Sequence, residues 1–526
     1  MTYAFAHGTR FAARHLARAI ALVLVTLLSS TASARSVDSV PPLPAPTGAV
    51  VNVSTEAQLQ SAIQRAASDM TIVIAPGTYV LSTTLFLNGV SNVTIRGGTD
   101  SRDDVVLVGP GMTNARYGNV PYGIWTGNVQ GITIANLTIR DLYFHPLIFN
   151  AGTQSPHVYN VHLIDAGQQF IKSNPDGAGG GVNNGIVEYS VIEYVTTARD
   201  DYTNGVDVHT GANWIIRHNL FRNIVAPPGL LAGPSVLMWN RSSNTLTEGN
   251  AFVNCARGIA YGLQEIPGFD HSGGIIRNNF FFRASGQSGD VAISVADSPQ
   301  TQVVNNTVYT SGTYGTPIEF RFAETTDALI ANNITDGIIS AREGATGTLL
   351  TNIENASTSL FVNLAAGDLH LAAGATTAID RGTTVSSVID DWDGRPRPQG
   401  AAYDIGANEV AGSSVGPGPP RNFIATLGVN TVSFAWIAPE SGDVAGYVIE
   451  AGTTSGWTGT NVATIPINST VPFYTVSLGG VAPGTYYVRV RAVNSSNQVS
   501  DPSNEQAVPV GTPTTTSPKH PPLSCT

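Results

Sequence analysis

The sequence predicts an all-β chain whose main part is a stack of coils built from short strands, and three observations lead to that prediction. Small polar residues recur 26 to 31 residues apart over eight segments, from IANLTI to IANNIT. A period in this range is typical of stacked repeats. The runs around them are rich in β-branched and aromatic residues and are too short for helices. Gly is abundant, with 55 residues, which suits many tight turns.

The recurring polar residues are expected to form one column, at the same bend of each coil. Stacked Asn side chains can hydrogen-bond to the coils above and below and satisfy backbone groups that the turn leaves unpaired. The predicted column comprises Asn136, His162, Ser190, Asn219, Asn250, Asn279, Asn306 and Asn333.

One short helix is expected before the first coils. Thr55-Glu-Ala-Gln58 is a capping-box pattern, which marks the N-terminus of a helix. Such a helix would cover the open edge of the stack. The apolar residues that follow fall on one helical face, and they are Leu59, Ala62, Ile63 and Ala66.

The N-terminus has the pattern of a secretory signal, which we predict for residues 1–34. Arginines precede the apolar run AIALVLVTLL, and Ala32-Ser-Ala34 fits a cleavage site. This run is too short for a transmembrane helix, and no later segment approaches membrane-spanning length. We therefore expect a secreted protein, extracellular or periplasmic, with no membrane span after signal removal. The net charge of −11 argues against nucleic acid as a partner.

Composition divides the remaining chain into five parts. Residues 35–48 form a linker rich in Pro and Ser, and 411–419 form a second linker of Gly, Ser and Pro. The coils occupy residues 49–410. Residues 420–510 alternate between strand patterns and turn signals, and the Pro/Thr-rich tail 511–526 is expected to be disordered.

A helix followed by TIVIAPGTY is the way in which many right-handed parallel β-helix proteins begin, and residues 49–410 resemble the pectate-lyase-like superfamily. The resemblance implies that fold and, for many members, polysaccharide lyase activity. The segment DWDGRPRPQGAAYDIGANE resembles the terminal segment of many secreted bacterial β-helix proteins, which implies that Arg and Asp pair to close the last coil. The matching residues are Asp393, Gly394, Arg395, Asp404, Gly406 and Glu409.

Residues 420–510 resemble a fibronectin type III domain in the segments PPRNFIATLGVNTVSFAWIAP, GYVIEAG and GTYYVRVRAVN. The resemblance implies a β-sandwich with Trp436 in its core. The predicted fold class is therefore all-β: a right-handed parallel β-helix solenoid with an N-terminal capping helix, followed by a C-terminal β-sandwich.

Candidate functional residues gather on one strand of successive coils. We align the strands LIFN, QFIK, VDVH and VLMW by their fourth residues. Alternate side chains of a strand point outward, and neighbouring strands lie about 4.8 Å apart. This alignment places Lys172, His209 and Trp239 in one exposed row with Asn150, and Asp207 beside His209. Long loops, where sites usually form, would wall a groove over these strands. They are residues 175–183, 195–205, 225–235 and 264–274.

These residue types suit the cleavage of an acidic, uronate-containing polysaccharide by β-elimination. A cation beside the uronate carboxylate acidifies the C5 proton, and Lys172 or His209 can then remove it as general base, with Asp207 orienting the imidazole. The residues permit this reaction, and the family resemblance motivates it. The residues expected to bind substrate are Trp239, by stacking on a sugar ring, Arg241 and Arg199, by neutralising the carboxylate, and Asn150.

Two other functions stay open at this point. A glycoside hydrolase on the same scaffold needs two carboxylates that flank one bond. Asp207 could pair with Asp200, Asp201 or Glu188, although no clear pair faces one groove. A non-catalytic carbohydrate-binding or surface protein needs only the Trp239 groove, with the fibronectin-like module as a spacer. A lyase requires both Lys172 and His209.

A calcium site is a further prediction. Asp200 and Asp201, together with Asp176 from the neighbouring loop, offer the oxygen ligands that Ca²⁺ takes, although they also suit an ordinary acidic loop. The chain has two cysteines, Cys255 and Cys525, so it is no disulfide scaffold, and whether the two pair stays open.

Overall fold

The protein is described here by a computed structural model. The described residues are 40–46, 48–410, 417–440, 444–458, 461–494 and 498–511. The predicted signal, Cys525 and almost all of the predicted tail lie outside them. Residue contacts divide the chain into two units, and the boundary follows Val410.

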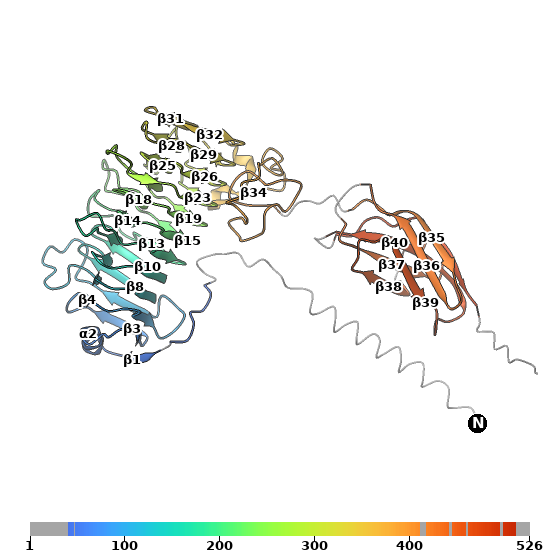
Figure 1. The fold of residues 1–526 in the computed structure, drawn as a ribbon, viewed down its shortest axis with the longest axis horizontal. Coiled ribbons are helices and arrows are strands. Elements are labelled where there is room, and N and C mark those ends of the chain that lie inside the picture. Colours follow the sequence, from blue (N-terminus) through green and yellow to red (C-terminus); the bar gives the residue numbers. More distant parts are fainter. Residues whose placement is uncertain are drawn as a thin grey trace, which may run out of the picture. The chain divides into compact units, whose positions relative to one another are not determined.

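The first unit is a right-handed parallel β-helix, as predicted, and its strands stack in chain order (Figure 1). One face is a ten-stranded sheet, called sheet B, that carries the candidate functional residues. Its strands are β4 (Leu85–Asn88), β7 (Ile124–Gly127), β9 (Leu147–Phe149), β11 (Ile171–Ser173), β14 (Val206–His209), β17 (Val236–Trp239), β21 (Ile259–Tyr261), β25 (Ile293–Ala296), β28 (Ile318–Arg321) and β31 (Ile339–Arg342).

The other two faces are joined into a twenty-stranded sheet, called sheet A, because β8 (Thr133–Leu142) and β10 (His157–Ala166) pair with strands of both faces. The first face continues with β1 (Ala49–Val53), β2 (Met70–Ile74), β5 (Thr94–Gly97), β12 (Ile186–Glu188), β15 (Ile215–Arg217), β19 (Leu246–Glu248), β23 (Ile275–Arg277), β26 (Gln302–Val304), β29 (Ala328–Ala331) and β32 (Gly347–Leu350). The second continues with β3 (Gly77–Val80), β6 (Val105–Val108), β13 (Val191–Glu193), β16 (Leu220–Arg222), β20 (Ala251–Val253), β24 (Phe280–Phe282), β27 (Thr307–Tyr309) and β30 (Ile334–Thr335).

The predicted capping helix is α2 (Glu56–Gln64). The Oγ1 of Thr55 accepts a hydrogen bond from the backbone N–H of Gln58 at 3.2 Å, and the side chain of Gln58 accepts from the N–H of Ser54 at 2.8 Å. Leu59 and Ile63 are buried in the core of the β-helix. The helix thus satisfies its own first backbone groups and packs its apolar face against the first coils.

An amide ladder runs through most of the predicted polar column. The Nδ2 of each Asn donates to the Oδ1 of the next at 2.9–3.0 Å, from Asn219 onward. Ser190 begins this column, because its N–H donates to the Oδ1 of Asn219, and Asn352 extends it by one coil beyond the prediction. Nearly all of these side chains are buried, so the ladder satisfies backbone groups inside the stack.

Two predicted members, Asn136 and His162, lie outside the ladder. Strand pairing aligns Asn136 one residue before the ladder position and His162 one residue after it. Asn136 instead hydrogen-bonds to Asn160, and both adopt positive φ, a conformation that Asn tolerates better than most residues. His162 binds Glu193. A second column of residues at positive φ therefore runs beside the ladder.

Replacing Asn279 by Ala should lower the free energy of unfolding by about 2 to 4 kcal/mol, because buried partners on both neighbouring coils lose their hydrogen bonds. Chemical denaturation of the purified variant measures the loss. Asn119→Ala is the matched control, since Asn119 is exposed and should change stability by less than about 0.5 kcal/mol. Equal effects for the two variants would contradict a supporting role of the ladder.

Glu193 makes the β-helix sensitive to acid. Burial alone would raise the pKa of Glu193, but hydrogen bonds from His162 and Arg222 outweigh it and hold the pKa at about 2. A depressed carboxyl pKa stabilises the fold above the unfolded value near 4.5, and this stabilisation is lost as the pH falls toward 2. Glu193→Gln should therefore unfold at lower denaturant concentration than wild type at pH 7, and this difference should shrink by pH 3.

The C-terminal segment of the first unit packs along the side of sheet A and does not close the last coil, which is the role that the resemblance implied. Asn278, Asn305 and Asn332 hydrogen-bond to its backbone. Arg395 pairs with Asp393 at 2.7 Å. Arg397 was not among the residues matched to the terminal segment of other β-helix proteins. It pairs with Glu409 at 2.6 Å, and neither side chain is exposed. Glu409 also accepts from the N–H of Asp404. The short elements of this segment are η1 (Thr358–Leu360), β33 (Phe361–Asn363), η2 (Leu364–Ala366) and β34 (Asp368–Leu371).

The second unit is a β-sandwich of two antiparallel sheets. Trp436 is buried in its core and contacts Tyr447 edge to face, with ring centroids 4.8 Å apart. Among the described residues, no helix has the length and apolar character needed to cross a membrane. The strands are β35 (Arg421–Leu427), β36 (Thr431–Ile437) and β39 (Phe473–Ser477) in one sheet, and β38 (Ala463–Ile467), β37 (Gly446–Gly452), β40 (Gly484–Val493) and β41 (Gln506–Val510) in the other.

Candidate active site

Lys172, Asp207 and His209 form one hydrogen-bonded cluster on the outer side of sheet B. The Nζ of Lys172, on β11, donates to the Oδ2 of Asp207, on β14, at 2.7 Å. The same Nζ lies 2.7 Å from the Nε2 of His209. The Oδ1 of Asp207 lies 3.4 Å from that Nε2. The three residues predicted to be catalytic are therefore in mutual contact.

Trp239 and Asn240 complete the cluster from the next coil. The indole Nε1 of Trp239 donates to the Oδ1 of Asp207 at 2.9 Å, and its ring centroid lies 4.6 Å from that of His209. The amide of Asn240 contacts the Nδ1 of His209 at 2.7 Å. Both ring nitrogens of His209 thus have a partner, and the orientation of the imidazole is fixed. No pattern in the sequence singles out Asn240.

The predicted alignment of Lys172 with His209 and Trp239 is wrong by two residues. Strand pairing sets Lys172 opposite Ile148 and Asp207, whereas His209 is opposite Trp239. Asn174, two residues after Lys172, donates to the Oδ1 of Asn150 at 3.0 Å. Lys172 nevertheless reaches His209, because its long side chain spans from one row of side chains to the other.

The cluster is more buried than an exposed row would be. Lys172 is 6% exposed and Asp207 is 2% exposed, whereas the side chain of His209 is 20% exposed. Burial alone would raise the pKa of Asp207, but the hydrogen bond with His209 and the charge of Lys172 outweigh it and lower the pKa. Asp207 is therefore a buried carboxylate, and His209 is the member of the trio that faces solvent.

The contact between Lys172 and His209 limits the protons that the pair can hold. An ammonium and an imidazolium would place two N–H donors against each other at 2.7 Å, so one of the two nitrogens must act as acceptor. The pair therefore carries one positive charge, which the Asp207 carboxylate balances. In one arrangement the Lys172 ammonium donates to a bare Nε2, and the Nδ1–H of His209 donates to the amide oxygen of Asn240, since the two ends of an amide exchange by a half turn.

The three other predicted substrate-binding residues have different surroundings. Asn150 lies one row from Lys172 and donates to the carbonyl of Thr126 at 3.2 Å. The guanidinium carbon of Arg199 lies 4.5 Å from the ring centroid of Tyr143, and its Nε lies 3.0 Å from the carboxylate of Asp200. The ring therefore covers the face of the guanidinium, and the carboxylate binds its edge. Arg241 is exposed, two residues after Trp239, and its side chain makes no contact within the described part of the chain.

The predicted calcium ligands have partners of their own. The Oδ1 of Asp176 accepts the N–H groups of Ala178 and Gly180, both at 2.8 Å, and these hydrogen bonds lower its pKa. Asp200 pairs with Arg199 and accepts the N–H of Tyr202, and Asp201 is exposed. Across the described ranges, no group of three or more His, Cys, Asp or Glu side chains could hold a metal ion.

An aromatic group beside the cluster was not predicted from sequence. The ring centroids of Tyr117 and Tyr143 lie 4.7 Å apart, and Tyr122 stacks on His145 at 5.7 Å with an interplanar angle of 7°. These rings and Phe144 come from the segments that precede β7 and β9. The signal available in the sequence was the density of aromatic residues at 117–125 and 143–149.

His145 is a second imidazole near the cluster. Burial, aided by the charge of Lys172, outweighs the hydrogen bond to Gln169 and lowers the pKa of His145 to about 4. Its Nδ1 lies 2.9 Å from the carbonyl oxygen of Gln169, so that nitrogen carries the proton and donates. His145 is therefore neutral at physiological pH with a bare Nε2, and it adds no charge to the Lys172–Asp207–His209 cluster.

Comparisons with known proteins found similar solved structures only. No family model matches the chain, and no curated protein matches it. An alginate lyase from Paenibacillus sp. is 17% identical, with a TM-score of 0.40, over 58% of this chain and 99% of that chain. A Fn3-like protein from Clostridium thermocellum is 29% identical, with a TM-score of 0.15, over 17% of this chain and 90% of that chain. Nothing about the activity of this chain follows from likenesses at this level.

Proposed function

We propose that this protein is a secreted polysaccharide lyase that cleaves a uronate-containing glycan by β-elimination at the Lys172–Asp207–His209 cluster. The observation that carries the proposal is the pair of 2.7 Å contacts that Lys172 makes with Asp207 and His209. A buried cluster with one mobile proton, open to solvent at an imidazole, is suited to general acid–base chemistry. The predicted signal over residues 1–34 supports secretion.

The proposed reaction begins with an exchange of partners at Lys172. The carboxylate of a bound uronate replaces the Nε2 of His209 as acceptor of the Lys172 ammonium. Pairing with a cation withdraws electron density from the sugar and acidifies the proton at C5. The Nε2 of His209 is then a bare nitrogen. Its Nδ1–H donates to the amide oxygen of Asn240 once that amide is turned by half a turn, because the Nδ2 of Asn240 otherwise faces Nδ1. Arg241, exposed beside Trp239, provides a second cation for the substrate carboxylate.

The second step of the proposed elimination is the removal of the C5 proton. The Nε2 of His209 takes the C5 proton, and the electron pair of that C–H bond forms the C4–C5 double bond as the C4–O bond breaks. The departing oxygen keeps the electron pair of the C4–O bond and takes a proton from solvent. The new Nε2–H lies 3.4 Å from the Oδ1 of Asp207, whose negative charge stabilises the imidazolium. Trp239 holds that carboxylate in place through its indole N–H. In this assignment His209 is the base, and Lys172 and Asp207 set its charge.

A hydrolase has less support from the positions of the carboxylates. Asp207 is buried and already accepts from Lys172 and Trp239. Glu188 lies on β12 of sheet A, where it binds His157 and Arg217. Asp200 pairs with Arg199. A pair that flanks one glycosidic bond, which hydrolysis requires, is therefore not formed by these candidates.

The test is a turnover assay with the purified mature protein on polygalacturonate, polymannuronate and polyguluronate. Each is incubated with Ca²⁺ and with a chelator, which also tests the proposed calcium requirement of the Asp176, Asp200 and Asp201 loops. We expect ultraviolet absorbance from the unsaturated product to rise with at least one polymer. New reducing ends without that absorbance would mean hydrolysis. Binding without either signal would leave a carbohydrate-binding protein and overturn the proposal.

A further inference from the structure

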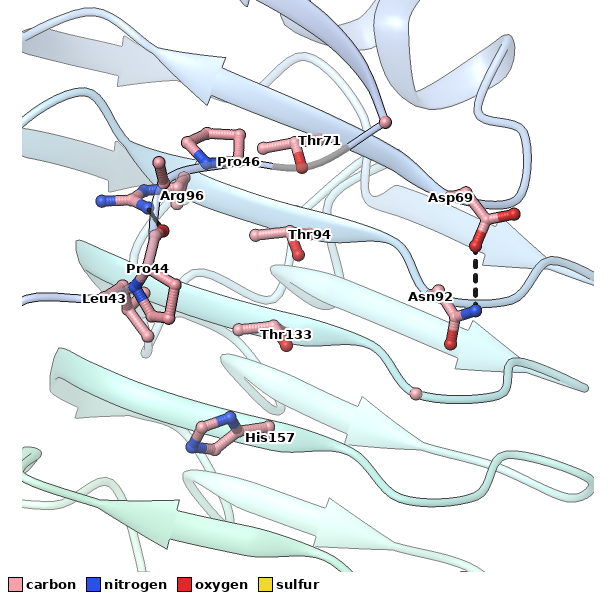
Figure 2. A pocket seen from close by; sticks show the side chains of 13 residues that line it. Leu43, Pro44, Pro46, Asp69, Thr71, Asn92, Thr94, Arg96, Thr133 and His157 are labelled. Atoms are coloured by element: carbon pink, nitrogen blue, oxygen red, sulfur yellow. Dashed lines mark hydrogen bonds between the residues drawn. The ribbon is translucent and has the colours of Figure 1, made fainter.

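A polar trough lies on sheet A, on a different face of the β-helix from the catalytic cluster. It has a volume of about 520 Å³ and is open to solvent. Its floor consists of Thr71, Thr94, Thr133 and His157, which strand pairing places in one continuous row on β2, β5, β8 and β10. Figure 2 shows these four side chains one above the other across successive strands.

A short segment of the N-terminal region forms one wall of the trough. We call residues 41–46 (PPLPAP) the proline strap. The guanidinium of Arg96 donates to the carbonyl of Pro44 at 3.1 Å, and the hydroxyl of Tyr159 donates to the carbonyl of Pro41. The opposite wall contains Asn92, whose amide donates to Asp69 at 2.9 Å (Figure 2). Both walls are therefore held in place by hydrogen bonds.

The hydroxyls of Thr94 and Thr133 are available to a ligand, because these side chains are partly exposed, whereas Thr71 is buried. Within the described part of the chain, the hydroxyls of Thr71, Thr94 and Thr133 make no hydrogen bond. The imidazole of His157 is held by Glu188 at 2.9 Å and ends the row. Beyond it, the same row on sheet A continues with Ile186, so the polar floor stops at His157. The trough thus offers a row of free hydroxyls that is limited to four coils.

The spacing of this row favours a polymer with a matching repeat. Adjacent strands lie about 4.8 Å apart, so the hydroxyls recur at that distance along the β-helix axis. This is close to the length of one sugar residue in an extended glycan chain, so successive sugars can meet successive threonines. Each hydroxyl can both donate and accept a hydrogen bond, as the hydroxyls of a sugar do. The pyrrolidine rings of the proline strap supply an apolar wall beside them.

We propose that this trough is a second, non-catalytic binding site for an extended glycan chain. The inference rests on the proposed function only in the class of ligand, because the trough shares no residue with the Lys172–Asp207–His209 cluster. A polymer held along sheet A by one stretch is tethered while another stretch enters the catalytic cluster on sheet B. Such a tether raises the local concentration of substrate without taking part in the reaction.

The test uses Thr→Val substitutions, which remove a hydroxyl and keep the β-branched shape of the side chain. The full mature chain with His209→Gln serves as background, so that the polymer is not degraded during the measurement. Migration is measured in native gels cast with polygalacturonate, polymannuronate or glucomannan. The variants are Thr94→Val with Thr133→Val, and the control is Thr348→Val, an exposed member of the same row outside the trough.

We expect the double variant to weaken retention by at least one glycan about tenfold, and the control to leave it unchanged. Thermal unfolding of all variants checks that the fold is kept. Unchanged retention in the double variant would overturn the inference, and so would a wild-type chain that no glycan retards. If the double variant loses retention but the turnover assay detects no cleavage of any polymer, the trough is supported and the catalytic proposal fails. In the active chain, KM for polymer should rise while kcat on a trisaccharide stays constant.

Discussion

Replacing His209 by Gln should lower kcat for glycan cleavage by about 10²- to 10⁴-fold, the range expected when a general base is removed. Gln retains an amide that can accept from Lys172, so the buried charges of Lys172 and Asp207 keep their pairing. The free energy of unfolding should therefore change little. Initial rates at saturating polymer, together with a denaturation curve for each protein, separate loss of chemistry from loss of fold.

Asn174→Ala is the control for this experiment. Asn174 lies in the same row as His209 on the preceding strand, and its side chain binds Asn150 rather than the cluster. We expect it to keep most of the wild-type kcat. A His209→Gln protein with more than half of the wild-type rate would show that the imidazole is not the base. In that case Lys172, as a neutral amine, becomes the candidate.

Replacing Arg397 by Met should lower the free energy of unfolding by about 3 to 5 kcal/mol, because Glu409 is then left as a buried charge without its partner. The guanidinium also donates to the carbonyls of Asp390, Asp404 and Gly406. One substitution thus removes the group that links Asp390 to residues 404–406 within the terminal segment. Denaturant unfolding of the first unit, with tyrosine and tryptophan fluorescence as the signal, measures the loss.

Arg381→Met is the matched control, since Arg381 is exposed in the same segment and should change stability by less than about 0.5 kcal/mol. The double variant Arg397→Met with Glu409→Gln should recover part of the loss, because the unpaired charge is removed. No recovery would assign the loss to the carbonyl contacts of Arg397 rather than to its ion pair.

The repeat in the sequence was sufficient to predict the β-helix, but it did not separate two neighbouring columns. Asn278 and Asn279 show why. The first adopts positive φ at a corner, and the second donates within the ladder. Both roles favour Asn, so a period alone cannot tell them apart. In β8 and β10 the ladder position holds the apolar residues Leu137 and Val161. The predicted column therefore departed from the ladder at Asn136 and His162.

The catalytic candidates were predicted correctly as a group in contact, although their alignment was not. Alternation of side chains fails at Phe170 and Ile171, because both are buried. Phe170 packs against Tyr194, with ring centroids 4.9 Å apart, rather than pointing outward. Phe170 precedes β11, which begins at Ile171, so the alignment of QFIK by its fourth residue was displaced by two. A displacement of two residues keeps every side chain on the same face, so alternation cannot detect it. The aromatic group around Tyr122 depends on loops whose paths no local pattern specifies.

The amide ladder also makes the stability of this protein sensitive to chemical change of its side-chain amides. Its members are side-chain amides, which hydrolyse slowly to carboxylates in warm or alkaline solution and are among the thermolabile groups of proteins. At Asn250 or Asn279, that reaction would replace an N–H donor with an oxygen that faces the Oδ1 of the next coil. Two acceptors then oppose each other in a buried site, so each conversion weakens two coils at once. An amide hydrolysed in the ladder should accordingly cost this protein more stability than one hydrolysed in an exposed loop.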